Sequence, residues 1–376
     1  AVKIADSDDP NINGQADPAV VGDEDPTRVV ITYPPSLPPT KTLVSPTLPE
    51  ATIGQEVTYV IRVPGTANTR PLYDVVVTDT LDDNLEYLGF NQTSGPTVTD
   101  NSVAPNLSFS VAQIPTGQQV VIELHARVHN VLSAQQGVVA DNTVSYTYAN
   151  APGGVTQPAL TSGTVTLHIV EPHIANFAKS ANPTTPAAGE TVRYSLTLTA
   201  SGDNYSSDVF DVTITDTLGL GLVYAGNPTV TVGGGVGANN AISEPVITGD
   251  GINQAQTLIW SLEGGNADID IVEGTSVTIS YDVRVLDGVL AQVLANSAVA
   301  QWTGIDGPSD YERDGSDGIG ELNDYVTAPA TATISNLPLL YAQKTAQIQE
   351  DFGSLGIVDP GDVLLYTIVL TNSGGV

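Results

Sequence analysis

The chain has 376 residues, a formal net charge of -31 and no cysteine. This negative charge disfavours nucleic acid and anionic membranes as partners, and the lack of cysteine excludes disulfide bonds. No uninterrupted apolar run approaches the roughly 18 residues that a membrane span requires.

The N-terminal 37 residues are acidic and are predicted to be the end of a preceding repeat, so that this sequence is a piece of a longer protein. Their opening has the spacing of a calcium-binding loop. Val20 stands where such a loop needs its bidentate Glu, and Asp17, Asp23 or Asp25 would have to substitute. The predicted ligands here are Asp9, Asn11, Asn13 and Asp17.

Two full repeats follow, predicted at residues 38–170 and 171–337, and a third begins at 338–376. The sequence YDVVVTDTL from Tyr73 returns as FDVTITDTL from Phe210. A Gly-led strand centred on Tyr begins at Gly54, Gly189 and Gly361. Self-similarity at this spacing indicates tandem domains, which the Pro-rich joint at 33–40 would keep extended.

Two-residue alternation of apolar and polar side chains runs through both repeats, and helical periodicity is nearly absent. Short strands separated by Gly, Pro, Asn and Asp turns favour immunoglobulin-like sandwiches. The predicted fold class is therefore all-β, with tandem immunoglobulin-like β-sandwich domains in an extended array. An insertion near 233–256 is predicted to be an exposed loop or hairpin of the second sandwich.

Alternation within the repeated strand places a carboxylate on each buried face. Asp79 shares a face with Val75 and Val77, and Asp216 shares one with Ile214, whereas Asp211 is predicted on the polar face. A buried carboxylate is costly unless another group pairs with it. Both aspartates therefore need partners from elsewhere in their repeats.

Further landmarks recur around that strand in a fixed order. A lysine precedes each Gly-led strand, and an Asn opens a late strand in both full repeats; these residues are Lys41, Lys179, Lys344, Asn142 and Asn296. This pattern of Lys, Gly with Tyr, TDTL and closing Asn resembles the bacterial surface repeat known as domain of unknown function 11. The resemblance covers nearly the whole chain and implies an extracellular, cell-surface location.

A first-strand Lys, a middle-strand acid and a last-strand Asn also resemble pilin and adhesin domains that form intramolecular isopeptide bonds. The resemblance implies bonds from Lys41 to Asn142 and from Lys179 to Asn296, with Asp79 and Asp216 as the assisting acids. The alternative is a buried ion pair of Lys and Asp in each repeat, with Asn as a hydrogen-bonded strand anchor.

A second acidic loop, DYERDGSDGIGE from Asp310, has acids at positions 1, 3, 5 and 12 and Gly at position 6. This spacing is that of calcium loops, so calcium is a predicted cofactor. The predicted ligands are Asp310, Glu312, Asp314, the backbone carbonyl of Ser316, and Glu321. The alternative is a solvated acidic turn, since the first repeat has ANAPGGVTQPAL in the same place.

No catalytic pattern stands out, and the chain is predicted not to be an enzyme. The leading hypothesis is a secreted structural protein that forms a stalk, fibre or matrix filament, with copies of itself or other surface proteins as partners. The alternatives are an adhesin, with a ligand site in the 233–256 insertion, and the accessory region of a secreted hydrolase.

Overall fold

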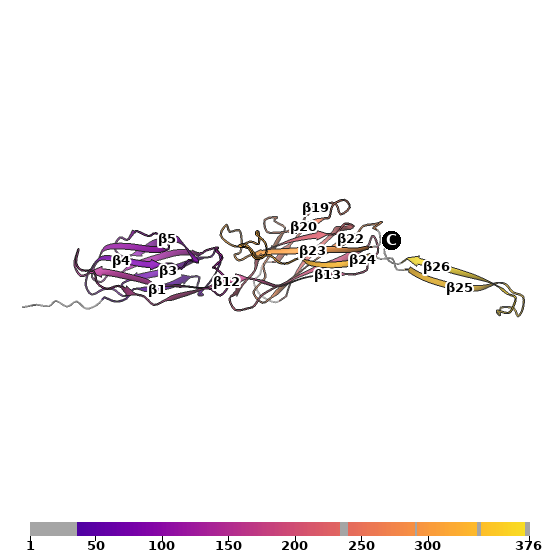
Figure 1. Cartoon of the computed structure of the whole chain (residues 1–376), viewed down its shortest axis with the longest axis horizontal. Helices are drawn as coiled ribbons and strands as arrows, with labels where there is room; N and C mark the ends of the chain where they lie inside the picture. The colour runs from indigo at the N-terminus through magenta and orange to yellow at the C-terminus, as the bar shows by residue number, and fades with distance from the viewer. Residues whose placement is uncertain (1–35, 234–239, 290–291, 337–339, 373–376) are drawn as a thin grey trace, which may run out of the picture.

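The computed structural model of the chain describes residues 36–233, 240–289, 292–336 and 340–372. All regular elements in these residues are β-strands, which confirms the predicted all-β class. No helix in this part of the chain is long and apolar enough to cross a membrane. The strands lie along one elongated molecule, with two sandwiches in line and a hairpin beyond them (Figure 1).

The first unit is a sandwich of a four-stranded sheet, β1-β3-β8-β5, and a five-stranded sheet, β11-β10-β4-β7-β6. In a further sheet β12 pairs with β2 and with β9. The strands are β1 (Thr40–Ser45), β2 (Glu50–Thr52), β3 (Glu56–Val63), β4 (Leu72–Thr80), β5 (Leu85–Ser94), β6 (Thr99–Asp100), β7 (Asn106–Ile114), β8 (Val120–Val128), β9 (Val139–Asn142), β10 (Val144–Ala149), β11 (Leu160–Thr161) and β12 (Val165–Pro172).

The second unit has the sheets β13-β14-β22-β17 and β19-β20-β16-β23-β24, with the pair β18-β21 beside them. Its strands are β13 (Ile174–Asn182), β14 (Thr191–Ala200), β15 (Ser206–Ser207), β16 (Phe210–Leu218), β17 (Leu222–Gly233), β18 (Asn240–Ile242), β19 (Val246–Thr248), β20 (Thr257–Trp260), β21 (Ala267–Ile269), β22 (Ser276–Val285), β23 (Gln292–Thr303) and β24 (Ala330–Asn336).

The two units repeat one strand order. In both four-stranded sheets the lysine strand (β1 or β13) comes first, the Gly-led tyrosine strand (β3 or β14) second, and the late Gly-led strand third. In both five-stranded sheets the TDTL strand, β4 or β16, lies in the middle of the sheet. The sequence landmarks therefore mark equivalent positions in space, with the TDTL strand of one sheet facing the lysine strand of the other.

Each unit has its own apolar core between its sheets. The first core includes Tyr59, Phe109 and Tyr146, and the second includes Tyr194 and Trp260, all fully buried. These residues sit at alternate positions of their strands, as the period-2 pattern predicts. Burial of this apolar area is the main favourable term in the stability of each unit.

The first residues of the repeated strand depart from the predicted alternation. Asp74 and Asp211 both have a φ of 50°, and the pairing of β16 with β23 shifts register between Phe210 and Thr213. Asp74 is exposed, whereas only 7% of Asp211 is exposed, because its Oδ2 accepts hydrogen bonds from the Gly307 N–H and from Thr303 Oγ1. Asp211 is therefore buried beneath the end of β23 and the loop that follows it, although alternation places it on the polar face. Alternation resumes by Ile214, and Asp79 and Asp216 are buried as predicted.

Two further segments lie outside the paired cores. The described part of the 233–256 insertion contains β18 and β19, which pair with β21 and β20. Residues 340–372 form one antiparallel hairpin of β25 (Leu340–Glu350) and β26 (Val363–Asn372). The hairpin carries the same lysine and Gly-Tyr landmarks as β1-β3 and β13-β14. Residues 1–35, which include the predicted ligands Asp9, Asn11, Asn13 and Asp17, lie outside the described residues.

Candidate functional site

A lysine and an aspartate meet in the core of the first unit. Lys41 extends from β1 in one sheet, and Asp79 extends from β4 in the facing sheet. The Lys41 Nζ donates a hydrogen bond to Asp79 Oδ2, and both side chains are 0% exposed. The lysine Nζ also lies 4.7 Å from the centre of the Tyr59 ring, on β3. The sequence-predicted pair is thus brought together across the sandwich.

The second unit has the same pair with one addition. Lys179 on β13 donates to Asp216 on β16, and both side chains are again 0% exposed. The Lys179 Nζ also donates to Tyr281 Oη at 3.0 Å, and this hydroxyl donates to Asp216 Oδ2. The corresponding residue of the first unit is Leu124, so that core has no such hydroxyl.

The closing asparagines lie beside these pairs. Asn296 on β23 is fully buried and donates through Nδ2 to Tyr281 Oη at 3.1 Å, while its Oδ1 has no partner. Asn142 at the end of β9 is 1% exposed and lies next to Asp79, where burial raises the pKa of the acid and the amide partly opposes that rise. Neither polar atom of Asn142 makes a hydrogen bond of good geometry. Each core therefore holds a lysine, an acid and a carboxamide with unsatisfied bonding capacity.

Burial shifts both partners of each pair toward their neutral forms. It lowers the pKa of Lys41 and of Lys179 to about 8, although the facing aspartate opposes the shift. It raises the pKa of Asp79 and of Asp216, opposed by the facing lysine. A charge is poorly solvated in an apolar core, so the neutral amine and the protonated acid become accessible there.

The structure corrects one element of the predicted arrangement, because the asparagines are not on the last strands. β10 and β12 follow Asn142 in the first unit, and β24 follows Asn296 in the second. In the second unit the asparagine strand lies next to the acid strand, because Asn296 pairs with Leu218, two residues beyond Asp216. In the first unit Asn142 ends β9, which pairs with β12, and the next strand, β10, pairs Val144 with Asp79. A bond in either unit would join its first strand to a late strand.

The third lysine repeats part of the site. The Lys344 Nζ of β25 lies 4.2 Å from the centre of the Tyr366 ring, as Lys41 lies over Tyr59. Both tyrosines are the central residue of a Gly-led strand. The lysine and tyrosine therefore form a fixed couple of the first two strands, even where a facing sheet is not among the described residues.

The predicted calcium loop has a different arrangement from an ion-wrapping turn. Asp310, Asp314 and Glu321 are exposed, and Ser316 donates its N–H to Asp314 Oδ1. Glu312 is buried and accepts from the N–H groups of Gly304 and Ile305, and burial raises its pKa to about 7. The calcium prediction for this loop stays a prediction.

One acidic group that sequence reasoning missed lies nearby. In the described ranges, Asp211, Asp270 and Asp306 form a group of three carboxylates whose nearest oxygens all lie within 4.8 Å of one another. Burial raises the pKa of Asp211, and it raises that of Asp270 to about 6. Asp211 is covered there by the residues around Gly307, and no spacing in the sequence indicates that contact.

These features define an all-β protein of tandem immunoglobulin-like sandwiches, each with a buried lysine site. No protein-family model and no curated protein matches the chain, so the surface-repeat family named above remains a resemblance.

Solved structures to which this chain is similar include the C-terminal domains of two antigen I/II proteins and two domains of a major pilin. The C-terminal domain of the antigen I/II polypeptide BspA of Streptococcus agalactiae is 10% identical, with 79% of this chain and 99% of that chain covered and a TM-score of 0.38. The C-terminal domain of the antigen I/II-family protein AspA of Streptococcus pyogenes is 11% identical, covering 80% and 99%, with a TM-score of 0.37. Domains D2 and D3 of the major pilin SpaD of Corynebacterium diphtheriae are 12% identical, covering 79% and 98%, with a TM-score of 0.31.

Proposed function

We propose that this chain is part of an extracellular, non-enzymatic structural protein whose sandwiches are each closed by an autocatalytic Lys–Asn isopeptide bond. The observation that carries the proposal is the repeated core site. The chain has four lysines, Lys3, Lys41, Lys179 and Lys344, and two of them are wholly buried against an aspartate, beside an asparagine. A core that only needed to be stable would be served as well by apolar residues of similar volume.

The chemistry follows from the protonation states that burial favours. The neutral amine of Lys41 would attack the Asn142 carboxamide carbon, forming the new C–N bond, while protonated Asp79 polarises the carboxamide oxygen. Asp79 would then pass the amine proton to the leaving nitrogen, and the old C–N bond breaks with release of ammonia. Lys179, Asp216 and Asn296 would react in the same way, with Tyr281 holding the carboxamide.

A cross-linked sandwich suits a protein that bears load. Each bond would close a loop of about 100 residues, which by analogy with disulfides stabilises the folded state by about 4–5 kcal/mol. Copies of this protein or other surface proteins would be its partners, and its role would be mechanical reach. Two units in line, as the structure has them, are the shape that such a role requires (Figure 1).

Intact mass spectrometry tests the proposal. The expected mass lies below the calculated mass by two molecules of ammonia, and Lys41→Arg or Asn142→Ala should restore one of them. Lys344→Arg is the matched control, since the described part of its repeat lacks the acid and late strands, and it should leave both bonds in place. A protein at its full calculated mass has neither bond, and the cores then hold plain buried ion pairs.

An adhesin is the second candidate, and one observation favours it. The insertion exposes three large apolar residues on and after β19, Val246, Ile247 and Ile252, at 49%, 41% and 66%. Exposed apolar groups on an edge strand and the turn after it can form a binding surface. If deletion of 240–256 abolishes adhesion of cells or beads that carry the protein, while both ammonia losses persist, the adhesin assignment is favoured.

A further inference from the structure

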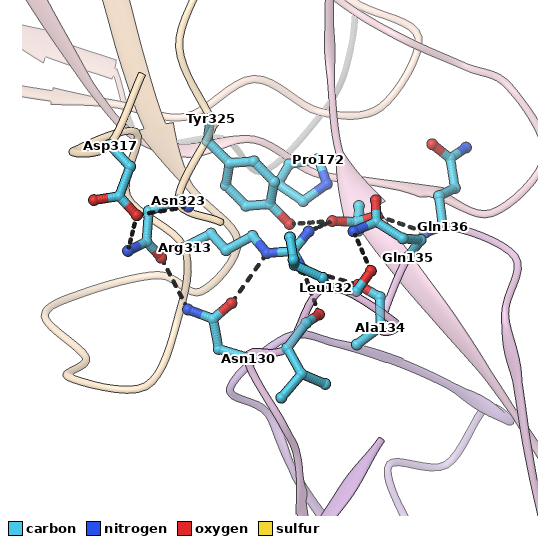
Figure 2. Close-up of polar contacts among 12 residues, drawn as sticks. Asn130, Leu132, Ala134, Gln135, Gln136, Pro172, Arg313, Asp317, Asn323 and Tyr325 are labelled. Carbon is cyan, nitrogen blue, oxygen red and sulfur yellow. Dashed lines mark hydrogen bonds and ion pairs between the residues drawn. The ribbon is translucent and has the colours of Figure 1, made fainter. Parts of the chain in front are cut away.

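An arginine of the second unit is buried against the first. Arg313 belongs to the loop between β23 and β24, and only 1% of it is exposed. Figure 2 shows its guanidinium between this loop, the 130–136 segment after β8 and the end of β12. Among the largest fully buried side chains of the described residues it is second only to Trp260.

The guanidinium makes four hydrogen-bonded contacts across the junction. Its Nη2 donates to the backbone carbonyls of Val131 and Ala134, each at 2.9 Å, and its Nε donates to Asn130 Oδ1 at 3.1 Å. Its Nη1 donates to Glu171 Oε1 at 2.5 Å. All three of its nitrogens are thus used by residues of the first unit, including the strand β12 that leads into the second.

Glu171 is held from both sides of the junction. Its Oε1 also accepts from Tyr325 Oη of the second unit at 3.0 Å, and its Oε2 accepts from the N–H of Gln136 in the first unit. Both carboxylate oxygens are therefore bonded, and only 9% of the side chain is exposed. A buried ion pair is tolerated when its hydrogen-bonding capacity is satisfied in this way, whereas removal of one partner leaves an uncompensated buried charge.

Secondary contacts surround this ion pair. Asn130 Nδ2 donates to Asn323 Oδ1 at 2.9 Å, as Figure 2 also shows. The guanidinium of Arg127, on β8, lies 3.4 Å from the centre of the Tyr311 ring. A Cβ on Gly54 would lie 2.9 Å from the Tyr311 carbonyl oxygen, so the units approach closely there.

Strand pairing also crosses the junction. β12 of the first unit pairs in parallel with β15 of the second, at Glu171 with Ser206 and Pro172 with Ser207. The His168 ring of β12 stacks on Tyr205 with ring centres 4.6 Å apart. A freely jointed linker would have neither a shared strand pairing nor a buried charge.

We propose that the acidic loop at residues 303–327 is a docking element that joins the second sandwich to the first as one rigid body, with Arg313 as its anchor. Its partner is the exposed end of the preceding repeat, which offers two carbonyls, an Asn side chain and a Glu. A planar fork of donors fits that set, whereas a lysine would not. This docking is independent of the Lys–Asn bonds, which lie inside each core.

Residual dipolar couplings measured on the full chain test the docking. One alignment tensor should fit the amides of both units in the wild-type protein. Arg313→Ala should abolish the common alignment, so that each unit needs its own tensor, while the amide spectrum within each unit is kept. Arg313→Lys should show the same loss. Arg284→Ala is the matched control: this arginine of the second unit pairs with exposed Asp287, and its loss should leave one tensor.

Two results would overturn the docking element. One is a wild-type chain whose units already need separate tensors. The other is an Arg313→Ala chain whose units keep a common tensor, which would make the buried arginine a support for the loop alone. If Arg313→Ala prevents the second unit from folding, Asn130→Ala and Asn323→Ala, which remove a bond at the edge of the junction, must still increase inter-unit motion. The intact mass of every docking variant should still show the loss of two molecules of ammonia. The docking test is thereby distinguished from the test of the Lys–Asn bonds.

Discussion

At the scale of single residues, the two cores share a buried pair of lysine and aspartate but differ in the groups around it. Lys41 has an aspartate, an aromatic ring and an unbonded carboxamide around it, whereas Lys179 also has the Tyr281 hydroxyl. A buried ion pair adds little net stability because desolvation offsets the attraction. Retention of the pair in both units is therefore better explained by chemistry than by folding energy.

The Tyr281 hydroxyl provides a test at this scale. Tyr281→Phe removes the group that holds the Asn296 carboxamide, so we expect slower ammonia loss in the second unit and an unfolding free energy lower by about 1–3 kcal/mol. Time-resolved mass spectrometry and urea unfolding measure the two effects. Tyr194→Phe is the control, since that buried hydroxyl has no partner. Equal rates in both variants would remove Tyr281 from the reaction.

The lysine pKa gives a second residue-scale prediction. In an Asn296→Ala variant the pair of Lys179 and Asp216 remains, but the carboxamide that the lysine would attack is gone. Above pH 8 its folded lysine has lost the proton that the unfolded lysine keeps up to its ordinary value of 10.5. The unfolded state then binds more protons, so the stability of this variant should rise with pH between about 8 and 10.5. In the cross-linked wild type the lysine is an amide, and urea midpoints should lack that rise at this site. The same rise in both proteins would contradict the bond.

At the scale of elements, alternation predicted most of the fold. It placed Asp79 and Asp216 inside, and the landmarks named the lysines and asparagines that lie beside them. It did not predict the burial of Asp211, because the residues that cover this side chain lie more than 90 positions later in the chain. Arg313 was also missed. Its partners lie more than 140 residues earlier in the chain, and spacing within a loop cannot reveal them.

Calcium binding by the acidic loop can be tested at the scale of elements. If calcium binds the second unit, a chelator should lower its melting temperature, because closely spaced acids then repel one another without compensation. Asp314→Asn with Glu321→Gln should abolish the effect if the ion sits in the predicted loop. Asp211→Asn with Asp270→Asn should abolish it if the ion sits among the three carboxylates instead. Calorimetry with and without chelator measures this, and an unchanged melting temperature leaves the loop with its docking role alone.

At the scale of the whole molecule, bonds within units and docking between units address different weaknesses of a chain of sandwiches. A pulled sandwich fails when its strands separate, and a string of sandwiches bends where they join. The proposed core bonds would act on the first weakness, and the proposed Arg313 docking would act on the second. Both sites lie in buried surroundings, where a low dielectric strengthens the interactions of paired polar groups.

Mechanical extension of the full chain tests the proposed bonds within the units. A bond between Lys41 and Asn142 removes the intervening segment of about 100 residues from the pulled path, which is roughly 35 nm of extended chain. Wild-type traces should therefore lack that length for the first unit, and Lys41→Arg should restore it. The bond between Lys179 and Asn296 would hide a slightly longer segment, released by Lys179→Arg. The residues before each lysine and after each asparagine still bear the pulling force. β24, which follows Asn296, should therefore detach under load in the wild type and in the Lys179→Arg variant alike. Full extension of the wild-type units would show that these cores carry no covalent load.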